Sequence, residues 1–162
     1  MRVFFARHQA KQPLRTAILA GLGGMIAIGA VGAATFYGHT LLIMAPFGAS
    51  SVLLFSVPNS PLSQPANVIG GHLVATLVGL VLRMLLPNDW WAVALAVGLV
   101  ITLMAVLRVT HPPAGADPLV VFAANPGFGF LILPVLSGAI MLVCVATLFH
   151  RCNGTLYPIR KA

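Results

Sequence analysis

The sequence predicts an all-α integral membrane protein, a helix bundle built from two internal repeats. Three observations lead to this prediction. The chain of 162 residues is 59% hydrophobic and 7% charged, whereas soluble domains carry about 25% charged residues. Residues 16–82 and 118–150 contain no Asp, Glu, Lys or Arg, and stretches of this kind need lipid as their solvent. A Pro-x-Gly-Ala motif occurs twice, 67 residues apart.

Four apolar segments have the length of a membrane-spanning helix, which is about 20 residues. They cover residues 14–36, 67–86, 90–108 and 129–150. Trp90 and Trp91 open the third segment, where aromatic side chains are typical of a membrane–water interface. Glycines in the first two segments allow helix backbones to approach one another closely.

Two shorter segments, residues 40–57 and 109–124, are interrupted by proline and glycine. Each broken helix of about 12 residues measures about 18 Å, which is too short for a hydrocarbon core of about 30 Å. Each repeat (about 14–86 and 90–150) is therefore a long helix, a broken short helix and a long helix. If the short helices also cross the membrane, each repeat has three crossings and the second repeat is inverted relative to the first. If they are re-entrant, four spans and parallel repeats result.

The basic residues frame the apolar chain. Seven of the nine lysines and arginines lie at its two ends: Arg2, Arg7, Lys11, Arg15, Arg151, Arg160 and Lys161. By the positive-inside rule, residues 1–13 and 151–162 are cytoplasmic and residues 14–150 form one transmembrane domain. We expect no nucleic-acid binding.

No metal-ligand spacing, facing histidine pair for haem or nucleophile–base pairing is visible, so we expect neither a cofactor nor an enzyme. A single thin bundle also suggests a homo-oligomer in the lipid bilayer.

The two motifs predict a solute site. A helix that begins inside the membrane directs free amide groups and a partial positive charge at its N-terminus, which suits an anion. The alternative is a packing hinge without a ligand. The candidate residues at the first break are Pro46, Gly48, Ala49, Ser50 and Ser51, and those at the second break are Pro113, Gly115, Ala116 and Asp117.

Polar residues near the breaks have more than one interpretation. His72 and His111 could bind a solute, relay protons or make structural hydrogen bonds. Asn67 could cap the following helix or line a vestibule. Asp117 could cap its own helix or carry a proton, and a charged Asp117 would attract a cation. His8 and His150 lie near the ends and are predicted to be at the surface.

The run from His111 to Ala116 resembles the signature of the HPP integral membrane family. Residues 46–50 and 64–72 are similar to other motifs of that family, and the resemblance covers about residues 14–150. It implies a four-helix membrane protein. Because plant chloroplast and cyanobacterial members are associated with nitrite transport, it implies a transporter or channel for nitrite or a similar small anion. A bacterial inner membrane is the expected location. The alternatives are a neutral-solute or cation conduit that uses Asp117, and a non-transporting sensor or scaffold module.

Overall fold

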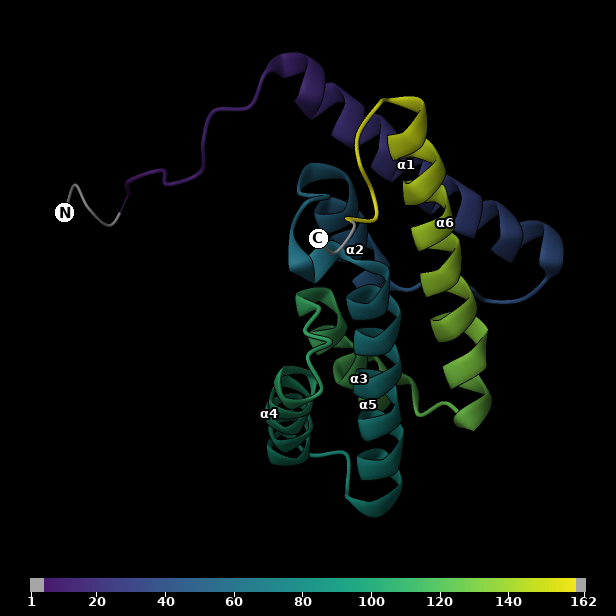
Figure 1. Ribbon diagram of the computed structural model, residues 1–162. Coiled ribbons are helices and arrows are strands. Elements are labelled where there is room, and N and C mark those ends of the chain that lie inside the picture. The colour runs from purple at the N-terminus through teal and green to yellow at the C-terminus, as the bar shows by residue number, and fades with distance from the viewer. Residues whose placement is uncertain (1–4, 160–162) are drawn as a thin grey trace.

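The structure is a computed structural model that describes residues 5–159. The predictions for Arg2, Arg160 and Lys161 lie outside the described residues. Within the described part, the chain forms helices and loops and contains no strand (Figure 1). The predicted all-α class is therefore confirmed.

Six α-helices form the bundle. They are α1 (Leu14–Gly38), α2 (Ala45–Ser56), α3 (Pro65–Leu85), α4 (Trp90–Val106), α5 (Asp117–Ala124) and α6 (Ser137–Cys152). Short 3-10 turns and one π-helical turn lie between them: η1 (Pro61–Ser63), η2 (Pro112–Ala116), η3 (Phe128–Leu131) and η4 (Ile132–Leu136), of which the last is π-helical.

Three stretches of the described chain are long and apolar enough to cross a membrane. These are α1, α3 and the segment Phe128–Cys152, which is kinked at Leu133, where the backbone is extended. Helix α4 has 17 residues, which corresponds to about 26 Å, and the fourth predicted span stays a prediction. The two predicted broken segments contain α2 and the η2–α5 pair.

Proline sets the start of several helices. Pro46 lies in the first turn of α2, Pro65 opens α3 and Pro112 opens η2. Proline suits a first turn because its missing amide would have had no partner inside the helix. It also forces the preceding residue into an extended conformation, which His111 adopts before η2.

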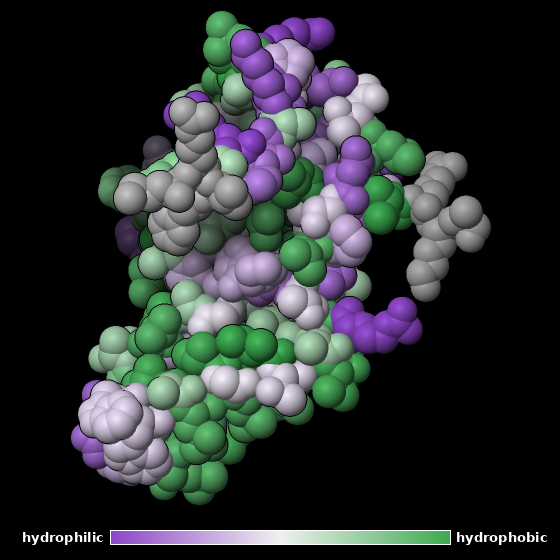
Figure 2. All heavy atoms as spheres, turned by 90° about the vertical axis from the view of Figure 1, so that its left-hand side faces the viewer, coloured by the Kyte–Doolittle hydropathy of each residue, from purple (hydrophilic) through white to green (hydrophobic). Residues whose placement is uncertain are grey.

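Helix α1 packs on the bundle through one narrow stripe of buried residues. It buries Gly23, Ala27 and Val31, which recur at every fourth position. A Cβ on Gly23 would collide with the ring of Phe55, so the glycine allows close packing of α1 on α2. Large apolar side chains cover the outer face of α1. Figure 2 shows hydrophobic residues over most of the lower body and hydrophilic residues gathered in the upper part.

The helices alternate in direction along the bundle. In Figure 1, α1 begins at the top, α3 runs downward to the bottom, and α6 rises back to the top. The short helices α2 and α5 lie in the middle of the molecule. Phe47 and Leu54 of α2 are fully buried and belong to the largest apolar core, together with residues of α1, α3 and α6. Helix α2 thus buries one face in the core, whereas Gly48, Ala49 and Val52 on its other side are exposed.

Candidate functional site

Four polar side chains from four parts of the chain meet inside the bundle. Ser50 comes from α2, His72 from α3, His111 from the residue before η2, and Asp117 from the first position of α5. All four are 0% exposed. We call these four residues the polar cluster.

The polar cluster is joined by short hydrogen bonds. Ser50 Oγ lies 2.9 Å from Nε2 of His72 and 2.9 Å from Nε2 of His111. His72 Nδ1 lies 2.8 Å from Asp117 Oδ2, and the Thr76 hydroxyl donates to the same oxygen over 3.1 Å. At the other end, His111 Nδ1 donates to the Leu62 carbonyl over 2.8 Å. The chain of contacts therefore runs without a gap from Thr76 to Leu62.

Local structure explains how these side chains come together. His72 and Thr76 lie one turn apart on α3 and share a face. Gly71 lets the second break approach that face, because a Cβ there would lie 2.7 Å from His111 Cβ and 3.0 Å from the Val109 carbonyl oxygen. Asn67 Nδ2 donates to the Thr110 carbonyl over 3.0 Å. Asn67 therefore ties α3 to the second break, whereas the sequence suggested a cap or a vestibule.

Asp117 and Ser50 do not cap helices. Asp117 is the first residue of α5, and its carboxylate turns toward α3. Its Oδ1 atom is buried and has no partner among the described residues. Ser50 lies in the interior of α2, where its hydroxyl also approaches the Pro46 carbonyl at 3.2 Å. Side-chain bonds across the bundle have replaced the local capping bonds that the sequence allowed.

The backbone amides near the breaks are mostly used within the helices. Ala49, Ser50 and Ser51 lie beyond the first turn of α2, where amides bond to carbonyls four residues earlier. The Asp117 amide donates to the Ala114 carbonyl. The meeting point of the two breaks therefore presents side chains rather than the row of free amides expected from the sequence.

The two breaks also share an apolar groove of about 760 Å³. Pro46 and Ala49 of the first motif face Pro113 and Ala116 of the second across this groove. Residues of both motifs thus line one groove through apolar atoms, while Ser50 and Asp117 from the same two breaks belong to the polar cluster. Gly115 is half-buried in η2, and a Cβ there would meet no atom within 4 Å.

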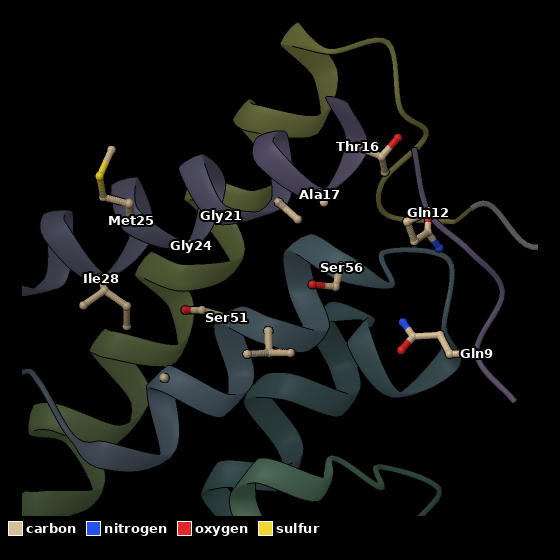
Figure 3. A pocket seen from close by; sticks show the side chains of 13 residues that line it. Gln9, Gln12, Thr16, Ala17, Gly21, Gly24, Met25, Ile28, Ser51 and Ser56 are labelled. Carbon is tan, nitrogen blue, oxygen red and sulfur yellow. The ribbon is translucent and has the colours of Figure 1, made fainter. Parts of the chain in front are cut away.

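Gly48 and Ser51 face a different cavity, a cleft of about 620 Å³ between α1 and α2 (Figure 3). The Ser51 hydroxyl is buried and has no partner among the described residues. Glycines on both helices leave the cleft open, because a Cβ on Gly21 or Gly48 would meet no atom within 4 Å. The polar side chains in the cleft are those of Gln9, Gln12, Thr16, Ser51 and Ser56.

Two features of the site differ from the sequence prediction. His150 is 4% exposed and its Nε2 donates to the Leu54 carbonyl over 2.9 Å, so the predicted surface position is wrong, whereas His8 is exposed. The last turn of α6 packs inward because the chain continues over it to Tyr157, whose ring lies beside His150. Thr76 was missed, although its spacing of four residues from His72 could have indicated it.

The polar cluster is suited to moving or holding protons. Each imidazole has both nitrogens in short contacts, and a hydroxyl bridges the two rings. Imidazole can release and accept a proton near neutral pH. Among the described residues no group of three or more His, Cys, Asp or Glu side chains could hold a metal ion.

Comparisons with known proteins place this arrangement in a family. Two proteins of Dictyostelium discoideum, each named only as a transmembrane protein, are 41% identical over 127 residues and 38% identical over 130 residues. These alignments cover 73% and 75% of this chain but 45% and 42% of the relatives. The chain therefore spans less than half the length of these relatives. No solved structure matches.

Residues 9–158 match the family described as "HPP, transmembrane region". This match includes all six α-helices, the polar cluster and both Pro-x-Gly-Ala motifs. The resemblance seen in the sequence is thus confirmed. The chain is a membrane protein of the HPP transmembrane family.

Proposed function

We propose that the chain is a conduit for a small inorganic anion, with nitrite as the first candidate, and that it works passively or linked to protons. The observation that carries the proposal is the polar cluster, which is fully buried where the two broken helices meet. Ionisable side chains inside a membrane protein are costly, and where they persist they usually serve function. The family resemblance supports nitrite as the first solute to test.

The cleft between α1 and α2 supports a route toward the polar cluster. It starts at Gln9 and Gln12 and reaches Ser51 and Gly48 (Figure 3). Ser51 and Ser50 are neighbours in α2, so the cleft ends one residue away from the polar cluster. Arg15 lines an adjacent pocket at the same end, and a basic entrance raises the local concentration of anions.

Contacts between the two halves support an internal repeat with twofold pseudo-symmetry. Gly71 packs against the Val109 carbonyl and Ala114, and Gly138 packs against the Leu42 carbonyl and Phe47. Adding 67 to each residue number of one half gives its counterpart in the other half, so these contacts are reciprocal. A second reciprocal pair exists, because Arg83 lies over the Phe122 ring and His150 stacks on Phe55.

The directions of the helices support six membrane elements rather than four. The start of α1 and the end of α6 lie at one end of the molecule, and α3 ends at the other (Figure 1). Helix α2 must therefore return the chain before α3 begins. We place both termini in the cytoplasm of a bacterial cell with this domain in the inner membrane, and we expect copies of the chain to form a homo-oligomer.

The net charge at Asp117 distinguishes the proposed anion from a cation or neutral solute. Paired with a protonated His72, its carboxylate adds no net charge to the site. An unpaired carboxylate would favour a cation or neutral solute instead. The substitution Asp117→Asn should abolish the flux of a cation that the carboxylate attracts, whereas it should not abolish anion flux measured without a pH gradient, which separates the two hypotheses.

The order Asp117–His72–Ser50 is also that of a hydrolytic triad. Ser50 lies inside a helix whose amides are used within it, so the two oxyanion donors that acyl transfer needs are not offered by its own turn. We propose no enzymatic role on this ground. A fluorophosphonate probe should leave Ser50 unmodified, and labelling that disappears in Ser50→Ala would contradict this.

Nitrite flux into proteoliposomes tests the proposed function. Wild-type protein should raise nitrite uptake well above that of empty vesicles. Gly48→Val should reduce uptake at least tenfold, because the added side chain fills the cleft and meets no packed atom. Gly29→Val is the matched control, since Gly29 of α1 also meets nothing within 4 Å and does not line the cleft.

Two results would contradict the proposal. Folded wild-type protein without nitrite uptake would exclude this substrate, and absence of flux for any small anion, cation or neutral solute would favour a sensor or scaffold. Equal uptake by Gly48→Val and Gly29→Val would show that the cleft is not part of the route.

A further inference from the structure

The bridging hydroxyl of Ser50 has too few hydrogens for its neighbours. It carries one hydrogen, and three acceptors lie within reach: Nε2 of His72, Nε2 of His111 and the Pro46 carbonyl. The Leu62 carbonyl can only accept, so His111 Nδ1 must carry a hydrogen. If both imidazoles were neutral with hydrogens on Nδ1, one Nε2 would face the serine oxygen without any hydrogen between them.

Such a contact is unfavourable at a position without solvent. The polar cluster is 0% exposed, and a buried acceptor without a donor is destabilising because it has lost its hydrogen bonds to water. One additional proton removes the conflict. With His72 protonated on both nitrogens, Nδ1 donates to Asp117, Nε2 donates to Ser50, and Ser50 donates to His111. Each contact between the four side chains then contains one hydrogen, and the longer 3.2 Å contact of Ser50 with the Pro46 carbonyl contains none.

A second hydrogen-bond arrangement contains the same number of protons and also leaves no contact between these side chains without a hydrogen. If His111 carries the added proton, its Nε2 donates to Ser50, and Ser50 turns its own hydrogen to His72. The two arrangements differ only in the direction of the hydrogen bonds through the hydroxyl. Ser50 therefore connects two proton positions of equal stoichiometry.

We propose that the polar cluster binds one proton and relays it between His72 and His111 through Ser50. In the step, the Nε2–H bond of His72 breaks and its proton binds Ser50 Oγ, while the former hydroxyl proton of Ser50 binds Nε2 of His111. The hydroxyl keeps one hydrogen throughout, and the positive charge moves from one ring to the other. Asp117 stabilises the charge on His72, and the Leu62 carbonyl stabilises it on His111.

Other charged groups on the surrounding elements are engaged elsewhere. Arg83 of α3 lies over the Phe122 ring, and His150 of α6 donates to the Leu54 carbonyl. Arg108 is exposed where α4 ends. Among the described residues, Asp117 is thus the carboxylate that contacts the imidazoles of the polar cluster, through His72.

The relay has a consequence for transport that rests on the proposed function. If each monovalent anion passes together with the proton of the polar cluster, no net charge crosses the membrane. Uptake would follow a pH gradient and ignore the membrane potential. An anion that moved alone would respond to the potential instead.

The proton count can be measured on the protein itself, without any transport assay. Solid-state ¹⁵N NMR of histidine-labelled protein in lipid bilayers at pH 7 distinguishes protonated from bare ring nitrogens. One of the two Nε2 atoms of His72 and His111 should be protonated and the other bare, with Gln variants of each residue providing the assignment. His150, whose Nε2 must donate to the Leu54 carbonyl, is the internal reference. Two bare or two protonated Nε2 atoms would overturn the proposal.

A second experiment separates the relay from the proposed function. Nitrite uptake into proteoliposomes is compared under an inward proton gradient and under a potassium diffusion potential set with valinomycin. Wild-type uptake should rise severalfold with the gradient and stay unchanged with the potential. Asp117→Asn should lose the response to the gradient, whereas Asp89→Asn, at the chain's other acidic residue in an exposed position, should keep it.

The possible results test the proton relay and the proposed function separately. Nitrite uptake that follows the potential and ignores the pH gradient would overturn the coupled relay and leave the proposed function intact. Absence of nitrite uptake would end the proposed function, and the NMR result would still decide whether the polar cluster holds one proton.

Discussion

At the scale of single residues, Asp117 has an incomplete set of hydrogen-bond partners inside the bundle. The carboxylate accepts from His72 and Thr76 through one oxygen, while its other oxygen has no partner among the described residues. A buried carboxylate with incomplete bonding is a poor device for stability alone. We propose that a proton or a solute occupies the site next to this carboxylate, which contacts the His72 imidazole.

The Thr76 hydroxyl should contribute measurably to stability. Thr76→Val removes one of the two donors to Asp117 and should lower the free energy of unfolding by about 1–3 kcal/mol, measured by SDS titration in mixed micelles. Thr76→Ser should retain most of that stability because it keeps the hydroxyl. Thr102→Val is the matched control, since the exposed Thr102 bonds only to the carbonyl four residues earlier. Equal stability of Thr76→Val and Thr102→Val would contradict the role of Thr76.

Sequence reasoning found the residues of the polar cluster but not their bonds. Histidine, serine and aspartate in charge-free segments are conspicuous, so Ser50, His72, His111 and Asp117 could be named individually. Ser50 and His111 are 61 positions apart in the chain, and the contact between them depends on the packing of helices that no local pattern specifies. Local rules instead suggested helix caps for Ser50 and Asp117, and the partners across the bundle replaced them.

At the scale of secondary-structure elements, close backbone contact holds the two halves together. The reciprocal glycine contacts place each broken element against a long helix of the other half. The order of long and short helices was predictable from apolar length and from proline and glycine positions. The break at the start of the last span was not predicted, although Pro134 within Ile132–Leu136 could have indicated the non-helical backbone at Leu133.

Adding a methyl group at Gly71 should separate the second break from α3. The new Cβ would lie 3.0 Å from the Val109 carbonyl oxygen and 2.7 Å from His111 Cβ, so η2 must shift. Gly71→Ala should therefore lower stability by about 1–3 kcal/mol and lower nitrite uptake. Gly98→Ala on α4 meets no atom within 4 Å and should be neutral. A Gly71→Ala protein with wild-type stability and uptake would be incompatible with the close contact.

The C-terminal segment closes over the loop that holds His111. The Tyr157 hydroxyl donates to the Ser63 carbonyl over 2.8 Å, next to Leu62, which accepts from His111. Burial raises the pKa of the Tyr157 phenol, so the hydroxyl stays protonated and keeps donating through neutral and alkaline pH. The segment should therefore remain attached as pH rises to about 10, the ordinary pKa of tyrosine.

Removing this bond should loosen the segment. Tyr157→Phe loses the donor and should increase trypsin cleavage after Arg151 severalfold, detected by mass spectrometry of protein in bilayers. Tyr37→Phe, at an exposed tyrosine of α1, should leave the cleavage rate unchanged. Equal cleavage in both variants would show that the Tyr157 bond does not hold the segment.

At the scale of the whole molecule, the bundle places polar groups where lipid cannot reach them. Apolar side chains cover the outer faces of α1 and α4, while the short helices α2 and α5 each bury one face, from which Ser50 and Asp117 join the polar cluster. Non-helical backbone at membrane depth is tolerated where protein surrounds it, which explains why both breaks lie at the centre. Everything proposed about protons and anions depends on the two breaks being adjacent in the bilayer.

Cross-linking in native membranes tests this adjacency most directly. Ala49→Cys and Ala116→Cys, which line one groove, are introduced after replacing Cys144 and Cys152 with serine, and a protease site is inserted in the exposed loop after Asn88. After cleavage, a short bifunctional thiol reagent should keep the two halves of this variant together. In the control variant, Ala49→Cys is paired with Ala94→Cys on the outer face of α4, and the two halves should separate. Halves that separate equally in both pairs would contradict the meeting of the two broken helices.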